Sequence, residues 1–311
     1  MKIMKQSGKI LLPESPTRHI ERIGRICYKS EDKITDGTDK KFVEKMFNNK
    51  HHAMLEHYRF IMQVRPDIYD WLSKIAPRHM EFSSYNDRLL ISFNARAIKN
   101  LKEDCRAQMF GILPMAVGGI ADELIGHIIR EYGCYELFGY GEDPHIMLST
   151  AVNFIDNSPA EMCPGEWNIH GWFSAHMITD RGITHEIVRH REETSFAQES
   201  TRYCDYSKNK HDRQITVIDQ GFSDDSEERN VWLMQMKNCE TAYLKLIDAG
   251  ISPQFARSVL PTCLKTEIVM TAPIYEWCHF FNLRMRGTTG APHPLIKELA
   301  TMVYEDMMEV F

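Results

Sequence analysis

Residues 173–207, FSAHMITDRGITHEIVRHREETSFAQESTRYCDYS, form the stretch around which the rest of the chain is organised. From 170 to 179, apolar and polar residues alternate, which is typical of a half-buried strand. Asp-Arg-Gly at 180–182 interrupts this alternation, and Ile183 and Ile187 then recur at helical spacing. The stretch therefore predicts a strand followed by a short helix whose polar side carries ionisable residues.

The end of this stretch is unusually rich in polar side chains. The fourteen residues 189–202 hold three arginines, a histidine, two serines, two threonines, a glutamine and three glutamates. A solvated helix end and a polar surface loop are the ordinary explanation of such a segment. However, guanidinium groups form planar forks that suit phosphate oxygens and imide carbonyls. Ser200, Thr201 and Arg202 add hydroxyl, backbone N–H and guanidinium donors side by side, so we expect an anion to bind here.

Composition excludes several classes of protein. The 311 residues carry a formal net charge of −6 and no run of lysines and arginines, which argues against a nucleic-acid polymer as partner. No apolar run approaches about 18 residues, so we expect no membrane span. The eight cysteines are scattered without a Cys-x-x-Cys pair, and no signal peptide precedes them. We therefore expect free thiols in a cytoplasmic protein.

The order Arg189-His190-Arg191, then Ser195, then Gln198 to Tyr203 resembles the signature of flavin-dependent thymidylate synthases. Residues 51–57 and 257–284 are similar to two further blocks of that family. The resemblance implies an α/β fold with an antiparallel or mixed sheet flanked by helices, assembled as a homotetramer with ligands bound where subunits meet. We expect one domain over residues 1–311, with a peripheral insertion at about 101–167.

The same resemblance implies a reaction. It is the FAD-dependent reductive methylation of dUMP to dTMP, with methylenetetrahydrofolate as carbon donor and NADPH as the reductant that recharges the flavin. The protein would then supply orientation and electrostatics. No cysteine stands in a recognisable nucleophile setting, unlike in the other type of thymidylate synthase.

The resemblance also assigns roles to residues. Arg284 or Arg202 would stabilise negative charge that develops on the pyrimidine ring, and Ser200 would position the substrate with its hydroxyl. The positions that match nucleotide ligands are Glu186, Arg189, Ser200, Thr201, Arg202, Arg257 and Arg284. The positions that match flavin contacts are Cys27, His51, Ala53, Glu56, His190, Arg191, His279 and Asn282.

The chain departs from the family pattern in three places. Residues 192–199 are one more than the usual spacing before Ser200, which we expect to bulge the helix end or to shift Arg189. Tyr275 stands where a flavin-binding arginine is common, and Ala291 where a histidine is usual, with His293 as its possible substitute. Hydroxymethylation, or action on a cytosine nucleotide, therefore stays open.

Two other classes of function also stay open. One is a nucleotide-binding regulatory relative that has lost FAD. The other is a metal-dependent hydrolase, although the His-Glu-x-x-His arrangement is absent and we expect no metal. Its ligands would be drawn from His51, His52, His57, His176 and His185.

Elsewhere, periodicity and turn residues predict a series of elements. Asn94 is placed to cap a helix that begins at residue 95. Turn-rich or mobile loops are expected at 78–87 and 208–228. Strands are expected at 58–64 and 89–92, and helices at 16–28, 40–48, 66–76, 117–132, 230–249, 274–283 and 293–310.

Overall fold

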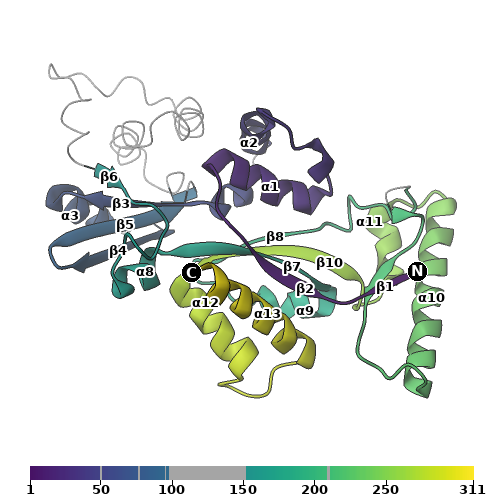
Figure 1. Ribbon diagram of the computed structural model, residues 1–311. Helices are drawn as coiled ribbons and strands as arrows, with labels where there is room; N and C mark the ends of the chain where they lie inside the picture. The colour runs from purple at the N-terminus through teal and green to yellow at the C-terminus, as the bar shows by residue number, and fades with distance from the viewer. Residues whose placement is uncertain (50, 76–77, 95, 98–151, 209–210) are drawn as a thin grey trace.

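A four-stranded antiparallel sheet is the centre of the computed structural model, which describes residues 1–49, 51–75, 78–94, 96–97, 152–208 and 211–311 (Figure 1). Its strand order is β2-β7-β10-β8. The two inner strands, β7 and β10, pair along nine residues, which makes them the longest ladder of the sheet. The strands span Ser7–Leu11 (β2), Trp172–Asp180 (β7), Lys265–Pro273 (β10) and Ser195–Gln198 (β8).

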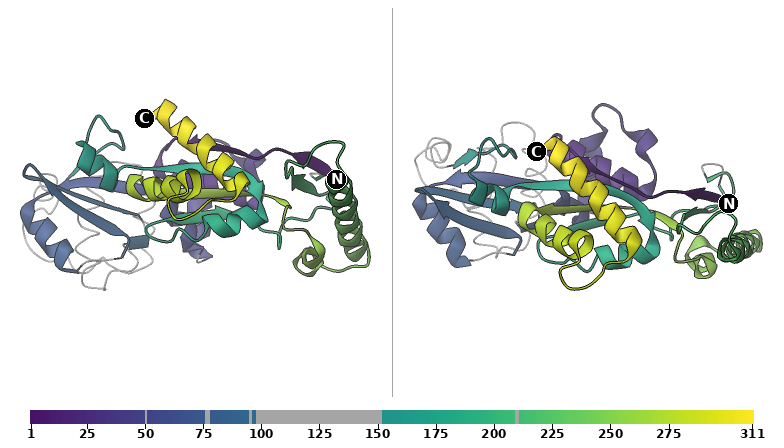
Figure 2. Two further views of the ribbon diagram at one scale, coloured as in Figure 1. Left: turned by 90° about the horizontal axis from the view of Figure 1, so that it is seen from below. Right: turned by 60° about the horizontal axis from the view of Figure 1, so that its bottom comes forward.

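The alternation predicted for β7 is confirmed, because successive strand residues point to opposite faces. Phe173, Ala175 and Met177 belong to one buried apolar cluster. Ser174 and His176 hydrogen-bond on the other face. Three helices cover the apolar face, as Figures 1 and 2 show: α9 (Arg181–Ile187), α12 (Ile274–Phe281) and α13 (Pro294–Val310).

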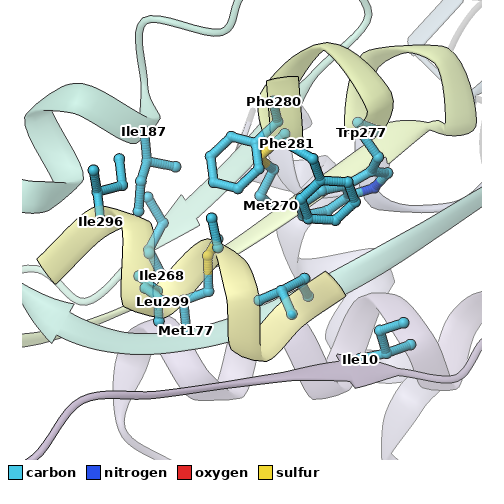
Figure 3. Packing of buried hydrophobic residues seen from close by; sticks show 14 of the residues in the cluster. Ile10, Met177, Ile187, Ile268, Met270, Trp277, Phe280, Phe281, Ile296 and Leu299 are labelled. Carbon is cyan, nitrogen blue, oxygen red and sulfur yellow. The ribbon is translucent and has the colours of Figure 1, made fainter. Parts of the chain in front are cut away.

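Aromatic side chains of α12 fill the space between this face and α13 (Figure 3). Trp277 is fully buried and stacks on Phe173 with ring centroids 4.4 Å apart and an interplanar angle of 9°. Its indole N–H donates to the backbone oxygen of Phe173 at 3.2 Å, so the ring is satisfied as well as packed. Phe281 stacks on Trp277 in turn and meets Tyr304 of α13 edge to face.

The opposite face carries α1 (Pro16–Tyr28), α2 (Thr38–Asn48) and the short 3-10 helix η1 (Glu31–Lys33) between them (Figure 1). The bounds predicted for the first helix are confirmed. Ile23, Ile26 and Cys27 of α1 pack against strand residues of the sheet. A Cβ at residue 24 would overlap the Phe42 ring, so Gly24 lets α2 approach α1 closely.

A buried chain of hydrogen bonds runs across this face of the sheet. His19 Nε2 lies 2.9 Å from Ser174 Oγ, which lies 2.6 Å from Thr271 Oγ1. Thr271 Oγ1 in turn lies 2.7 Å from Nδ1 of His57, the last residue of the 3-10 helix η2 (His52–His57). Burial lowers the pKa of His19 to about 3 and that of His57 to about 4, so both rings are neutral at neutral pH.

We expect the free energy of unfolding to fall as the pH drops from about 6.5 to about 4. The ordinary histidine pKa is 6.5, so in this window the unfolded chain binds protons that folded His19 and His57 exclude. Fewer protons on the folded state mean that stability is complete above the unfolded pKa and is lost below it. Urea unfolding midpoints near pH 7 and near pH 5 measure this; equal midpoints would contradict it.

A second antiparallel sheet, in the order β4-β5-β3-β6, lies at one end of the molecule (Figure 1). Asn86 and Asp87, with φ of 49° and 63°, make the tight turn between its first two strands. Residues 80–85 are thus a strand, and the loop predicted at 78–87 is wrong there. Its elements are β3 (Arg59–Val64), β4 (Met80–Tyr85), β5 (Arg88–Asn94) and β6 (Val152–Phe154), with the helices α3 (Pro66–Ile75) and α8 (Pro164–His170).

The predicted helix cap at Asn94 is confirmed, because its Oδ1 accepts hydrogen bonds from the backbone N–H groups of Arg96 and Ala97. The predicted helix at 117–132 and most of the predicted insertion lie outside the described residues. The described end of that segment is built into the second sheet: β6 pairs with β3, and α8 buries His170 against Ser83.

At the other end, β1 (Lys2–Met4) pairs in parallel with β9 (Thr216–Ile218) beside the long helix α10 (Glu227–Asp248). The loop predicted at 208–228 is therefore wrong where β9 forms. Gly250, with φ of +84°, follows the end of α10 as predicted. The chain then forms α11 (Pro253–Ala256) and the 3-10 helix η5 (Arg257–Val259).

The helix predicted at 274–283 differs from the observed structure at its C-terminal end. The helix predicted at 274–283 ends at Phe281 and continues as a π-helical turn, η6 (Asn282–Arg286). π-turns inside or after α-helices are frequent at functional sites. Arg284 lies in this turn and points toward α9.

Candidate active site

Arg284 is held by two residues that lie almost a hundred positions earlier in the chain. Its Nη1 donates to Glu186 Oε2 at 2.9 Å and its Nη2 to the Glu186 backbone oxygen at 3.1 Å. Its Nε donates to His190 Nε2 at 3.2 Å. Because a guanidinium has about five N–H groups, two remain unused while the plane of the group is fixed. Three residues predicted for ligand binding thus converge.

His190 is buried, and its ring is neutral. Burial, together with the charges of Arg284 and His279, lowers its pKa to about 4. Since Nε2 accepts from Arg284, the ring proton belongs on Nδ1. That Nδ1 is a buried atom with no hydrogen-bond partner among the described residues. His190 therefore offers an unused donor, and the His279 ring lies beside it with centroids 5.5 Å apart.

A second group surrounds Thr201 and Arg257. Arg257 Nη1 donates to Thr201 Oγ1 at 3.1 Å, within a cavity of about 600 Å³. Arg181 and His185 of α9 line the same cavity. No aspartate or glutamate among the described residues lines it, so its ionisable groups are all potential cations. Such a cavity suits a phosphate group.

A third group of predicted residues lies around η2. His51 Nδ1 lies 2.9 Å from Tyr28 Oη. Glu56 pairs with Arg96 through Oε1 and accepts from Ser195 Oγ at 3.1 Å through Oε2. Ala53, in the same 3-10 helix, is exposed. Glu56 is therefore engaged on both oxygens, whereas Ala53 offers an open surface.

Cys27 lies on the same face of the sheet as His51, and its side chain is buried. Its side chain packs with Leu11, Ile23 and Val269 in an apolar cluster. Burial raises the pKa of its thiol to about 12, so it is protonated at neutral pH and is not a nucleophile. Any contact with a flavin would need a rearrangement around this side chain.

The remaining predicted residues are mostly exposed. Ser200 Oγ accepts a hydrogen bond from the Arg202 backbone N–H at 3.3 Å. The Arg202 guanidinium carbon lies 5.7 Å from the centroid of the Tyr203 ring. Asn282 Oδ1 accepts from Arg286 Nη1 at 2.7 Å. The side chains of Arg189 and Arg191 are exposed, directly after α9.

The predicted site residues therefore divide between two faces of the central sheet. Glu186, His190 and Arg284 belong to the face covered by α9 and α12. Cys27 and His51 belong to the face covered by α1 and α2. One protomer does not bring all of them into one cavity.

The extra residue after Arg191 does not bulge α9, so the first of the two expected effects is wrong, and the expected shift of Arg189 stays a prediction. α9 ends at Ile187, so residues 189–191 already follow it, and the extra length is taken up in the loop before β8. Glu193 in that loop has φ of 44° and its carboxylate lies 3.4 Å from Arg59 Nη1. The loop is thus anchored to the second sheet.

The other two departures also have structural roles. Tyr275 Oη donates to Glu81 Oε1 at 3.4 Å, and burial raises the pKa of its phenol to about 12 despite the nearby Arg59 charge. His293 caps α13, because its Nδ1 accepts from the backbone N–H of Leu295 at 3.2 Å. His293 is therefore a helix cap, and Tyr275 is a neutral hydrogen-bond donor.

Sequence reasoning missed a charged network on the α1 face. Lys265 Nζ pairs with Glu199 Oε2 at 3.0 Å and also with Glu267. Burial alone would raise the pKa of Glu267, but the hydrogen bond from His176 and the charges of Lys265 and Lys29 hold it well below its usual range. Local periodicity gave little signal for this network, because Glu267 lies in β10, where eight of nine residues are buried.

The alternative of a metal-dependent hydrolase is not supported by any cluster of potential metal ligands among the described residues. Among the described residues, no three histidine, cysteine, aspartate or glutamate side chains are gathered as potential metal ligands. His57 and His176 are instead hydrogen-bonded to Thr271 and Glu267. Separately, none of the helices in the described ranges is both long and apolar enough to cross a membrane.

The second half of the chain matches a known protein family. Residues 157–311 match the family described as Thymidylate synthase complementing protein. The flavin-dependent thymidylate synthase of Geobacter sulfurreducens is 36% identical over 134 residues, which are 40% of this chain and 56% of that protein. The flavin-dependent thymidylate synthase of Pyrococcus furiosus is 33% identical over 127 residues, which are 41% of this chain and 50% of that protein.

The chain thus spans about half the length of the curated relatives it matches. Among solved structures, a UMP/dUMP methylase from Streptomyces cacaoi, bound with 5-Br dUMP, covers 100% of this chain and 91% of its own at 12% identity and a TM-score of 0.38. The family match includes β7, β10 and the converging residues Glu186, His190 and Arg284. Through residues 157–311, the chain belongs to the flavin-dependent thymidylate synthase family.

Proposed function

We propose that the protein methylates dUMP to dTMP, with FAD as cofactor, methylenetetrahydrofolate as carbon donor and NADPH as reductant. The observation that carries this proposal is the cavity around Thr201 and Arg257. Its 3.1 Å hydrogen bond, the Arg181 guanidinium and the His185 ring fit the phosphate of a mononucleotide. The family relatives, which are named flavin-dependent thymidylate synthases, indicate which mononucleotide it would be.

Arg284 is the residue we propose for the pyrimidine ring. Methylation needs negative charge to develop on the ring, and a fixed guanidinium stabilises such charge as an oxyanion-hole donor does. Glu186 and His190 hold the group so that two N–H donors remain for a ligand. Ser200, beside the phosphate cavity, would position the nucleotide through its hydroxyl.

The residues on the α9–α12 face also fit a flavin. The unpartnered Nδ1–H of buried His190 can donate to a ring nitrogen or carbonyl, with His279 alongside. Arg191 and Asn282 would contribute from the same face. When bound, the reduced flavin supplies the hydride, and the protein contributes orientation and exclusion of water.

The division of predicted residues between two sheet faces supports a site completed by a second protomer. His51, Ala53 and Glu56 lie around η2, away from the Arg284 group. We therefore propose a homotetramer in which the η2 surface of one protomer meets the Arg284 surface of another. Each flavin would then contact both.

The phosphate cavity gives a direct test. In an Arg257→Ala variant, we expect the KM for dUMP to rise by about 10- to 100-fold, because a charge-assisted contact to the phosphate is lost. The variant should also lose the preference of the wild-type protein for dUMP over deoxyuridine, which lacks the phosphate. Steady-state rates over a range of both nucleotides measure this.

Arg213→Ala serves as the control, since Arg213 pairs with Asp248 on the surface, where both side chains are 54% exposed. Its KM for dUMP should match that of the wild-type protein. An unchanged ratio of dUMP to deoxyuridine activity in Arg257→Ala would refute the phosphate assignment.

A flavin-free nucleotide-binding relative would share the phosphate cavity, so flavin uptake must be measured separately. The proposal predicts a yellow protein whose absorbance bleaches on addition of NADPH. A colourless protein that takes up no added FAD would leave nucleotide binding without the proposed chemistry.

A further inference from the structure

Glu199 is a buried carboxylate that directly precedes Ser200 and Thr201, the residues proposed to bind the nucleotide phosphate. It is only 2% exposed, and its Oε2 lies 3.0 Å from Nζ of Lys265 on β10. Its backbone N–H donates to the Glu267 backbone oxygen at 2.8 Å. Glu199 is therefore held to β10 by both its side chain and its backbone, at the point where the phosphate loop begins.

Lys265 is itself fixed by a larger group of charges. It also pairs with Glu267, whose other partners are Lys29 at the end of α1 and His176 of β7. The side chains of Lys265, Lys29 and His176 are each 15% exposed, so water screens these pairs only weakly. The two lysines balance the charges of Glu199 and Glu267. The group therefore ties the start of the phosphate loop to three separate elements.

The loop that follows Glu199 is closed on itself and is fixed again at its far end. The Ser200 backbone oxygen accepts hydrogen bonds from the backbone N–H groups of Tyr203 and Cys204, at 3.1 and 2.9 Å. Cys204 is buried in an apolar cluster. Thr201, which lines the phosphate cavity, stands between these two anchors. A displacement of Glu199 therefore moves Thr201.

We propose that Lys265 is a positioning residue for the nucleotide phosphate, which acts through Glu199. A carboxylate removed from water needs a compensating charge. Without Lys265, Glu199 would turn toward water, and Ser200 and Thr201 would move with it. The Glu199 backbone oxygen also accepts from Arg181 Nη1 at 3.4 Å, so the same displacement would release a cation that lines the cavity. This inference rests on the proposed binding of dUMP in that cavity.

Calorimetric titration of the whole protein with dUMP tests this role. Lys265→Met removes the cation and keeps an unbranched side chain, so the Kd for dUMP should rise by about tenfold. Adding Glu199→Gln removes the carboxylate that Lys265 compensates, and the double variant should regain most of the wild-type affinity. Wild-type affinity in Lys265→Met, or equal weakening in the double variant, would overturn the proposal.

Two comparisons separate positioning from a purely structural role. Deoxyuridine lacks the phosphate, so its affinity should be the same in wild-type and Lys265→Met protein. Arg88→Met removes a cation from another half-buried pair, with Glu166 at 3.1 Å beside the second sheet, and should leave dUMP binding unchanged. If Lys265→Met weakened dUMP and deoxyuridine equally, Lys265 would serve stability alone and the proposal would be wrong.

Glu199→Asp tests position without loss of charge, and it still decides the matter if Lys265→Met does not fold. The aspartate side chain is one methylene shorter, so it reaches Lys265 only if the backbone moves toward β10 and takes Ser200 with it. We expect the Kd for dUMP to rise by about threefold or more. An unchanged Kd would show that the pair does not set the place of the loop.

Hydrogen exchange separates a failure of this inference from a failure of the proposed function. Without ligand, the backbone N–H groups of Tyr203 and Cys204 should exchange faster in Lys265→Met than in wild-type or Arg88→Met protein. Unchanged exchange would overturn the inference even if the protein methylates dUMP. Faster exchange in a protein that binds no dUMP would support the anchor of the loop and refute the proposed function instead.

Discussion

Arg284→Ala is expected to lower the turnover number for dTMP formation by about 10²- to 10³-fold. The Arg284 guanidinium is fixed by three hydrogen bonds, from Nη1 and Nη2 to Glu186 and from Nε to His190. Its unused N–H groups are thus oriented before a ligand arrives, and catalytic stabilisation depends on such prior orientation. Single-turnover dTMP formation with saturating dUMP measures the loss.

Arg284→Lys and Arg22→Ala complete this experiment. Lysine keeps the charge but lacks the planar fork, so it should restore little of the rate. Arg22→Ala removes an exposed arginine that pairs with Glu14, and its rate should stay at the wild-type level. Wild-type turnover in Arg284→Ala would show that the ring charge is stabilised elsewhere.

Trp277→Ala is expected to lower the free energy of unfolding by about 3–5 kcal/mol. Trp277 is fully buried, stacks on Phe173 at 4.4 Å and donates to its backbone oxygen (Figure 3). Alanine would leave a cavity between α12 and the central sheet. Urea unfolding of both proteins measures the difference.

The matched control for the core is Phe222→Ala. Phe222 is 39% exposed, so its removal should change the free energy of unfolding by about 0.5 kcal/mol or less. If Trp277→Ala were no less stable than this control, α12 would not be anchored through its tryptophan.

The elements predicted best from sequence are those whose two sides differ in polarity. The first helix, residues 16–28, has an apolar stripe facing the sheet, and β7 alternates because its two faces have different neighbours. β10 was missed, because eight of its nine residues are buried and its polar members Glu267 and Thr271 are satisfied by distant partners. Those partners are distant in the sequence, so the local pattern of apolar and polar residues cannot reveal them.

The site shows the same limit. Family resemblance named Glu186, His190 and Arg284, but their hydrogen bonds depend on the π-turn after α12, which no local pattern predicted. The resemblance also named Cys27, whose side chain lies in the apolar core. Sequence similarity selects positions, whereas the direction of each side chain is set by packing.

Arg202 and Arg284 were expected to converge on one nucleotide. In one protomer they have different neighbours: Arg202 lies over Tyr203, which contacts Tyr28 of α1, whereas Arg284 is hydrogen-bonded to Glu186 of α9. Their convergence therefore remains a proposal about two protomers.

We propose that this chain methylates dUMP at a flavin site. The most direct measurement is the mass of the pyrimidine product formed from dUMP with FAD, methylenetetrahydrofolate and NADPH, each omitted in turn. We expect a product heavier than dUMP by one CH₂ group, formed only when all components are present. A product heavier by one CH₂O group would show hydroxymethylation instead, and unchanged dUMP from a protein that has taken up FAD would contradict the account.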